Sequence, residues 1–216
     1  MATMEMIKDL RERTGAGILD CKKALGESED NVEKAIDWLR AKGIASAAKK
    51  SGRAAAEGVV ECYVHAGGKI GVMVEINCET DFVALTDAFK GLCRDVAMHI
   101  AAASPEFVRR EDVPADAIDR ERAVQIQRVM AEGKPEHIAA KIVEGRLGKY
   151  YEDCCLYEQK FVKDDSKTVE QVVKEAVSTI GENIQVRRFA RYVMGEGLAK
   201  REDDFAAEVA KQAGVA

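Results

Sequence analysis

The sequence predicts an α+β protein, with helices at the N-terminus and a mixture of strands and helices after it. Three observations predict this class. Apolar residues recur at helical spacing through residues 1–43. Residues 58–77 are rich in β-branched side chains on either side of a glycine turn, which is typical of a β-hairpin. The chain beyond residue 150 then alternates strand, helix, strand and helix patterns.

The first domain is expected to be a bundle of three short helices spanning residues 1–43. The helices are expected to end at Gly15, Gly26 and Gly43, because glycine readily adopts the left-handed conformation that often follows a helix. A bundle of this size is only marginally stable by itself. Residues 44–57 are rich in small residues and fit either a helix or an extended linker. We expect the domain boundary there and treat 44–57 as the linker.

The second domain is expected to be an α+β core over residues 58–200 with an antiparallel sheet. Its first hairpin turns at Ala66-Gly67-Gly68. The remaining patterns predict a helix over 83–103, a strand over 154–162, a helix over 168–180 and a strand over 183–195. A last helix is expected over 201–216.

Two charged, alanine-rich helices are expected within this core, at about 114–131 and 135–148. Pro114 and Pro135 suit the first turn of each helix. The turn between the helices is so short that they should fold back on each other as an antiparallel hairpin. Because the pair carries few large apolar residues, we expect the hairpin at about 114–148 to protrude from the core.

Composition restricts the classes of function. The chain has 216 residues, a net charge of −5 and 47% hydrophobic residues, which is typical of a soluble globular protein. Lys and Arg are mixed with Asp and Glu along the whole length, which argues against direct nucleic-acid binding. No apolar run approaches the roughly 18 residues of a membrane span, and the first residues lack a secretory pattern. We therefore expect a cytoplasmic protein with no membrane partner.

The residues that usually carry chemistry form no recognisable catalytic set. The six cysteines include no C-x-x-C pair, so neither a zinc site nor a thioredoxin-type motif is indicated. No metal or cofactor is expected. The three histidines, His65, His99 and His137, are far apart in sequence, and His99 is expected to be a hydrogen-bonded structural residue. No catalytic residue is assigned, and the chain is not expected to be an enzyme.

Two segments carry a family resemblance. Leu10–Leu25 (LRERTGAGILDCKKAL) and Glu75–Leu85 (EINCETDFVAL) resemble the signature segments of the elongation factor Ts family, in the family's order and at its distance. The match continues over nearly the whole chain, with a departure at Leu85, where the family usually has a basic or amide residue. The resemblance implies a ubiquitin-associated (UBA)-like N-terminal bundle. It also implies the short form with one sheet module, so that a homodimer in a 2:2 complex is possible.

The resemblance further implies a function. Members of the elongation factor Ts family are guanine nucleotide exchange factors that bind GDP-bound elongation factor Tu, displace Mg²⁺ and promote GDP release so that GTP can bind. Mg²⁺ displacement is implied for Thr80, Asp81, Phe82 and Val83. Partner binding is implied for Arg11, Ile18 and Leu19, which would face the GTPase domain, and for Phe161 and Val162, which would contact a separate domain.

The orientation of Phe82 decides between two interpretations. From the residues alone, Phe82 is expected to begin the apolar stripe that Phe89 continues and to pack in the protein's own core. The family resemblance favours an outward Phe82 that acts as a rigid apolar wedge on the partner.

Two other functions fit parts of the sequence. An RNA-binding role would use the arginines Arg187, Arg188 and Arg191, which alternate with aromatic residues on a strand. A thiol enzyme would use Cys154 and Cys155. A strand with one solvated face and ordinary reduced thiols explain the same residues.

Overall fold

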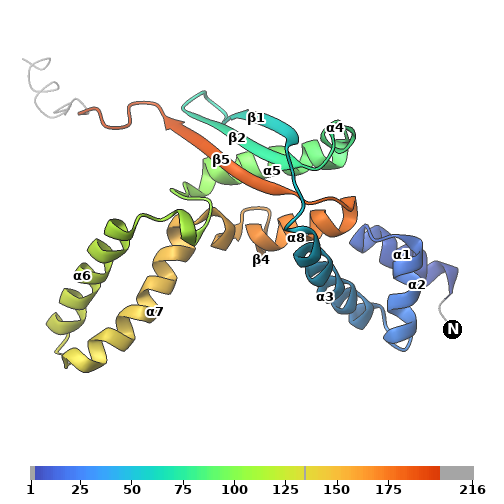
Figure 1. Ribbon diagram of the computed structural model, residues 1–216, viewed down its shortest axis with the longest axis horizontal. Coiled ribbons are helices and arrows are strands. Elements are labelled where there is room, and N and C mark those ends of the chain that lie inside the picture. Colours follow the sequence, from blue (N-terminus) through green and yellow to red (C-terminus); the bar gives the residue numbers. More distant parts are fainter. Residues whose placement is uncertain (1–2, 134, 200–216) are drawn as a thin grey trace, which may run out of the picture.

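The computed structural model describes residues 3–133 and 135–199 and confirms the α+β class. Figure 1 shows an elongated molecule with a sheet in its middle, a helical bundle at one end and a helical hairpin at the other. The bundle consists of α1 (Met4–Thr14), α2 (Ile18–Glu27) and α3 (Val32–Lys50). The predicted helix over 201–216 lies outside the described residues.

The N-terminal bundle forms because each helix has local start signals and one apolar side. Thr3 caps α1 by accepting a hydrogen bond from the Met6 N–H, and Asn31 caps α3 in the same way. The predicted ends after α1 and α2 are confirmed to within two residues. The buried side chains of the three helices meet in one small core: Ile7, Leu10, Cys21, Ala24, Leu25 and Ala35.

The predicted end of the third helix at Gly43 is wrong, because α3 continues through Gly43 to Lys50. Gly43 is buried, and a Cβ at this position would lie 3.1 Å from the Ser178 Oγ. The glycine therefore lets α3 pack closely on α8 (Val169–Ile180) rather than ending the helix. Residues 44–50 of the expected linker are helical, and residues 51–56 lead on to the first strand.

Three antiparallel strands form the main sheet in the order β1-β2-β5. β1 (Glu57–Val64) and β2 (Ile70–Cys78) are the predicted hairpin, and β5 (Gln185–Val193) adds to the far edge of β2. Gly58 has a φ of 141°, and a Cβ there would lie 2.2 Å from the Ile76 carbonyl oxygen. The start of β1 therefore requires glycine.

One face of this sheet is covered and the other is open. The side chains of Val72, Val74 and Ile76 on β2 are buried against α5 (Asp87–Ala103). The predicted apolar stripe of this helix is confirmed, since Phe89, Leu92, Val96 and Ile100 all lie in the same core. The alternate residues of the strands point to the opposite face, where no helix of the described residues lies (Figure 1).

The predicted helical hairpin is present and protrudes from the sheet (Figure 1). It consists of α6 (Ala115–Ala131) and α7 (Glu136–Cys154), preceded by the short 3₁₀ helix η1 (Arg110–Asp112). The two helices have their own small core around Val129, Val143 and Leu147. No helix in the described part of the chain is long and apolar enough to cross a membrane.

The predicted strand over 154–162 is largely wrong. α7 extends to Cys154, a 3₁₀ helix η2 (Leu156–Glu158) follows, and only β3 (Lys160–Phe161) is extended, paired with β4 (Asp164–Thr168). Cys154 and Cys155 do not alternate between two faces but are both buried, with Val113, at the base of the hairpin. The apolar run is therefore a buried helix end rather than a strand, two patterns that sequence periodicity does not distinguish.

Candidate functional site

The single aromatic ring of the signature segment Glu75–Leu85, that of Phe82, lies on a short, capped turn. Thr80 is the N-cap of α4 (Asp81–Ala84), and its Oγ1 accepts a hydrogen bond of 3.4 Å from the Val83 N–H. Ala84 is buried and Val83 packs against the sheet core. Phe82 points the other way and is 79% exposed. The interpretation that Phe82 packs in the protein's own core is wrong, because the capped turn presents the ring to solvent.

A second apolar surface lies on the N-terminal bundle. Ile18 and Leu19 form the first turn of α2, and Leu19 is 83% exposed. Arg11 is also exposed, in the last turn of α1. The chain between them turns at Gly15, where a Cβ would lie 3.4 Å from the Thr179 Cγ2 of α8. These three predicted partner-binding residues are therefore on the surface, on a bundle that packs against the core.

The third predicted surface is divided between a buried and an exposed residue. Phe161 is only 6% exposed, so its side chain belongs to the core and does not lie at the surface as a direct contact would require. Val162 is 50% exposed. The Val162 N–H donates to Nδ1 of buried His99 at 3.2 Å, and the His99 ring stacks on Phe161. The buried pair of His99 and Phe161 therefore holds the backbone at Val162 in place.

His99 is a structural histidine, as predicted. Because its Nδ1 accepts from Val162, its Nε2 carries the proton that is donated to the Gln159 Oε1 at 3.0 Å. Burial lowers the pKa of the His99 imidazole, so the neutral form is favoured. The Gln159 amide in turn donates to the Asp153 carbonyl at 2.7 Å.

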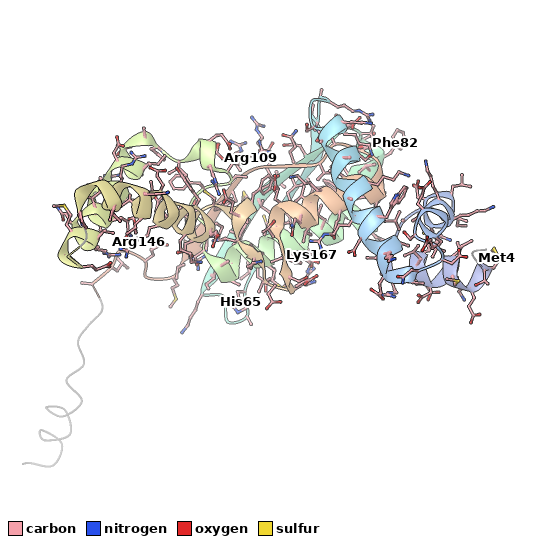
Figure 2. The ribbon with its side chains drawn as sticks, turned by 90° about the horizontal axis from the view of Figure 1, so that it is seen from below. Met4, His65, Phe82, Arg109, Arg146 and Lys167 are labelled. Atoms are coloured by element: carbon pink, nitrogen blue, oxygen red, sulfur yellow. The ribbon has the colours of Figure 1, made fainter. Side chains whose placement is uncertain are left out.

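The three surfaces come from different elements. The Phe82 turn lies just before the start of α5, whereas His99 and Val162 lie near its end, about 18 Å away along the helix at 1.5 Å per residue. Figure 2 shows Phe82 on the half of the long axis that also carries Met4 of α1, with Arg146 of the hairpin toward the opposite end. The arrangement suits contact with a large partner at several points and does not enclose a small molecule.

Comparisons with known proteins agree with this arrangement. The family model described as Elongation factor TS matches residues 26–196. Elongation factor Ts of Desulforamulus reducens is 63% identical over 207 residues, which cover 96% of this chain and 95% of the relative. Elongation factor Ts of Heliobacterium modesticaldum is 59% identical over 209 residues, 97% of each chain. That of Geobacter sulfurreducens is 58% identical over 213 residues, 99% of each. The chain belongs to the elongation factor Ts family.

Membership of the elongation factor Ts family makes the chain a factor of translation elongation in protein biosynthesis. The relatives match nearly all of this chain and are of similar length. The signature turn with Phe82 and the N-terminal bundle are therefore features of an elongation factor Ts chain.

Cys154 and Cys155 of this elongation factor Ts chain are poorly suited to thiol chemistry. All six cysteines are free, and Cys62 is the one that is exposed. Burial raises the pKa of Cys154, and raises the pKa of Cys155 to about 12, so neither forms the reactive thiolate readily. Among residues 3–133 and 135–199, no group of His, Cys, Asp or Glu side chains is placed to hold a metal ion. The adjacent cysteines are packing residues.

The arginines weighed for RNA binding are engaged within the protein. The Arg187 Nη1 and the Arg188 Nε donate to the two carboxylate oxygens of Glu75 at 2.8 and 2.7 Å. These two bonds hold the pKa of the Glu75 carboxyl below its usual range. Arg191 instead donates to the Ala101 carbonyl, and Phe189 packs against the core. The pattern is that of a strand with one solvated face, which fits an elongation factor Ts core better than an RNA platform.

Sequence reasoning missed one residue that the structure places at the signature turn of this elongation factor Ts chain. The carboxylate of Glu182 accepts hydrogen bonds from the backbone of Glu79 and from Thr80. The two segments are about a hundred residues apart, so no local spacing in the sequence connects them. The signal that was available is a carboxylate directly after the helix-ending Gly181.

Proposed function

We propose that this chain is a guanine nucleotide exchange factor for elongation factor Tu, acting in the cytoplasm without bond chemistry of its own. It binds the GDP-bound partner, displaces the partner's Mg²⁺ and promotes GDP release so that GTP can bind. The observation that carries the proposal is the outward Phe82 on a capped turn within the family's signature segment.

The proposed step is mechanical. Phe82 enters a pocket between elements of the GTPase domain as a rigid apolar wedge, while Asp81 accepts hydrogen bonds from the partner. Thr80 caps the turn, and Val83 anchors it to the core. The displaced elements of the partner then no longer hold Mg²⁺ in place, and GDP loses a strong electrostatic contact.

Phe82 alone is too weak for this function. Burying one phenylalanine stabilises a complex by about 1.5–3 kcal/mol, which is roughly a 10- to 100-fold change in an equilibrium constant. Arg11, Ile18 and Leu19 therefore bind the GTPase domain at a second point. Val162, supported by Phe161, binds a separate domain. Binding at these remote points offsets the free-energy cost of distorting the Mg²⁺ site.

Thermodynamic linkage adds a requirement. If this protein weakens GDP binding to elongation factor Tu by some factor, GDP must weaken the binding of this protein by the same factor. The protein should therefore bind nucleotide-free elongation factor Tu much more tightly than the GDP-bound form.

We also propose that the chain forms a homodimer through the open face of its sheet, so that a 2:2 complex assembles with the partner. Val60, Val64, Met73 and Tyr192 are each more than half exposed and come from all three strands. On this face, Glu75 pairs with both Arg187 and Arg188 within one protomer, which leaves one net positive charge. The apolar part of this surface suits a two-fold interface in which the same patch meets itself.

The test of the exchange function is the release of a fluorescent GDP from elongation factor Tu, chased with excess unlabelled GDP at fixed Mg²⁺. Adding this protein should accelerate release, and the rate should saturate as its concentration rises. A release rate that is the same with and without the protein would show that it is not an exchange factor for this GTPase.

A further inference from the structure

Glu182 makes three hydrogen bonds beneath the signature turn. Its Oε2 accepts from the backbone N–H groups of Glu79 and Thr80, each at 3.0 Å. Its Oε1 accepts from the Thr80 hydroxyl at 2.6 Å. Hydrogen bonds to a carboxylate are stronger than those between neutral groups. One side chain from the start of the β5 segment thus holds the backbone that leads into α4.

The contact is reciprocal. The Glu79 Oε1 accepts from the Asn183 N–H at 2.7 Å, so each of the two segments offers a carboxylate to the backbone of the other. The Asn183 side-chain amide donates to the Arg53 carbonyl at 2.7 Å and to the Ser51 carbonyl at 3.3 Å. Glu182 and Asn183 therefore connect the Phe82 turn to the segment that follows α3 and, through α3, to the N-terminal bundle.

The sheet itself does not hold this backbone. The pairing of β1 with β2 ends at Glu57 and Cys78, and the pairing of β2 with β5 ends at Asn77 and Gln185. The N–H groups of residues 79 and 80 lie beyond both ladders. Because unpaired backbone N–H groups in partly buried positions are costly, Glu182 is what fixes the chain there.

Glu182 also sets the direction of the Thr80 hydroxyl. Since that hydroxyl donates its proton to Glu182, its oxygen lone pairs are free to accept from the Val83 N–H, which is the bond that caps α4. The carboxylate thus acts on α4 twice, through the backbone before it and through its N-cap.

We propose that Glu182 is a positioning residue for nucleotide exchange: it fixes the Glu79–Thr80 backbone so that Phe82 is held rigidly against the partner. This inference rests on the proposed exchange function. The Phe82 ring can displace elements of the partner only if the turn that carries it moves less than those elements do. A turn of four helical residues has little stiffness by itself, so the resistance must come from groups that tie it to the core.

The experiment compares Glu182→Ala and Glu182→Gln with the wild-type protein in the fluorescent GDP release assay, over a range of concentrations. For Glu182→Ala, the maximal release rate should fall about tenfold, equivalent to 1.4 kcal/mol. The half-saturating concentration should stay within about twofold, since the remote contact surfaces are unchanged. The maximal release rate of Glu182→Gln should lie between those of the wild type and Glu182→Ala. The amide keeps one acceptor oxygen for the two backbone N–H groups, but its NH₂ group cannot accept from the Thr80 hydroxyl.

A matched control is Glu170→Ala. Glu170 is a partly buried glutamate in the first turn of α8, at the opposite end of that helix from Glu182, and it pairs with Lys174 at 2.7 Å. Its variant should keep the wild-type maximal rate. Circular dichroism and urea unfolding at the assay temperature establish that each variant is folded.

A double-mutant cycle with Phe82→Ala separates positioning from general stability. If Glu182 acts through Phe82, Glu182→Ala should slow exchange in the wild-type background and have no further effect in the Phe82→Ala background. Independent, multiplicative effects would overturn the inference. If Phe82→Ala slows release but folded Glu182→Ala does not, positioning by Glu182 is wrong while the exchange proposal stands. If Phe82→Ala is as fast as wild type, the wedge itself is wrong and positioning falls with it.

Discussion

At the scale of single residues, His99 is the clearest case of a polar side chain that supports an exposed one. It is fully buried, and both ring nitrogens are used, one as the acceptor for the Val162 N–H and one as the donor to Gln159. Protonation of Nδ1 would remove that acceptor and leave the Val162 N–H facing a cation. The neutral ring is therefore part of the fold and of the surface around Val162.

The first prediction concerns the pH dependence of stability. Burial lowers the pKa of His99 in the folded state, whereas an unfolded histidine has a pKa of about 6.5. Between the folded pKa and about 6.5, the unfolded state binds more protons, so this residue makes the free energy of unfolding rise with pH and fall as the solution is acidified. The difference in unfolding free energy between wild type and His99→Gln should therefore shrink between about pH 7 and pH 5.

Urea unfolding at several pH values measures this difference. His65→Gln, which removes an imidazole from the exposed turn after β1, reports the effect of losing a surface histidine. If the difference in unfolding free energy between wild type and His99→Gln stays constant over the whole pH range, His99 is not held neutral by the fold.

At the scale of secondary-structure elements, the packing of α3 on α8 joins the N-terminal bundle to the core. Gly43 lies against Ser178 of α8, and the Lys50 Nζ donates to the Val177 carbonyl at 3.2 Å further along. The position of Ile18 and Leu19 relative to Phe82 is therefore set by a helix-helix contact and not by a free linker.

The second prediction tests this contact. Gly43→Val places a branched side chain against Ser178 and should lower the free energy of unfolding by about 1–3 kcal/mol, the usual cost of overpacking. Gly26→Val is the matched control, because Gly26 is also helical and a Cβ there meets no atom within 4 Å. The control should change stability by less than about 0.5 kcal/mol. Equal stability of the two variants would contradict the close packing of α3 on α8.

These elements also show how far sequence patterns reach. The β1–β2 hairpin, α5, α8 and β5 were predicted because each has a clear period and clear boundary residues. Gly43 was misassigned because a glycine that allows close packing and a glycine that ends a helix look alike in one sequence. The buried run at 154–156 was misassigned for a similar reason, since it lacks a period. Only the family resemblance predicts that the Phe82 ring points outward. No sequence pattern predicts the role of Glu182, because its contact with the turn depends on tertiary structure.

At the scale of the whole molecule, the predicted contact surfaces are distributed over an elongated body (Figure 1). The Phe82 turn, the first turn of α2 and Val162 lie on different elements around one core. The open face of the sheet is a fourth surface, and Cys62 lies on it, opposite Met73 of the neighbouring strand. That cysteine makes the proposed homodimer measurable.

The third prediction is that alkylation of Cys62 depends on protein concentration. Dilute protomers should expose this thiol, whereas the dimer should protect it. Tyr192→Arg places a charge in the same face, and this variant should sediment as a monomer and react at one rate at every concentration. A wild-type protein that sediments as a monomer and whose Cys62 reacts equally fast at all concentrations would rule out the dimer proposed here.

The central claim is that an outward Phe82 drives nucleotide release from elongation factor Tu, and the most direct measurement is the maximal rate of fluorescent GDP release with Phe82→Ala. Because the ring is solvent-exposed, its removal should leave the fold intact, and the maximal rate should fall at least tenfold, more than about 1.4 kcal/mol. Met130→Ala, which removes an exposed apolar side chain from the distant hairpin, is the control. A folded Phe82→Ala protein that releases GDP as fast as wild type would contradict the claim.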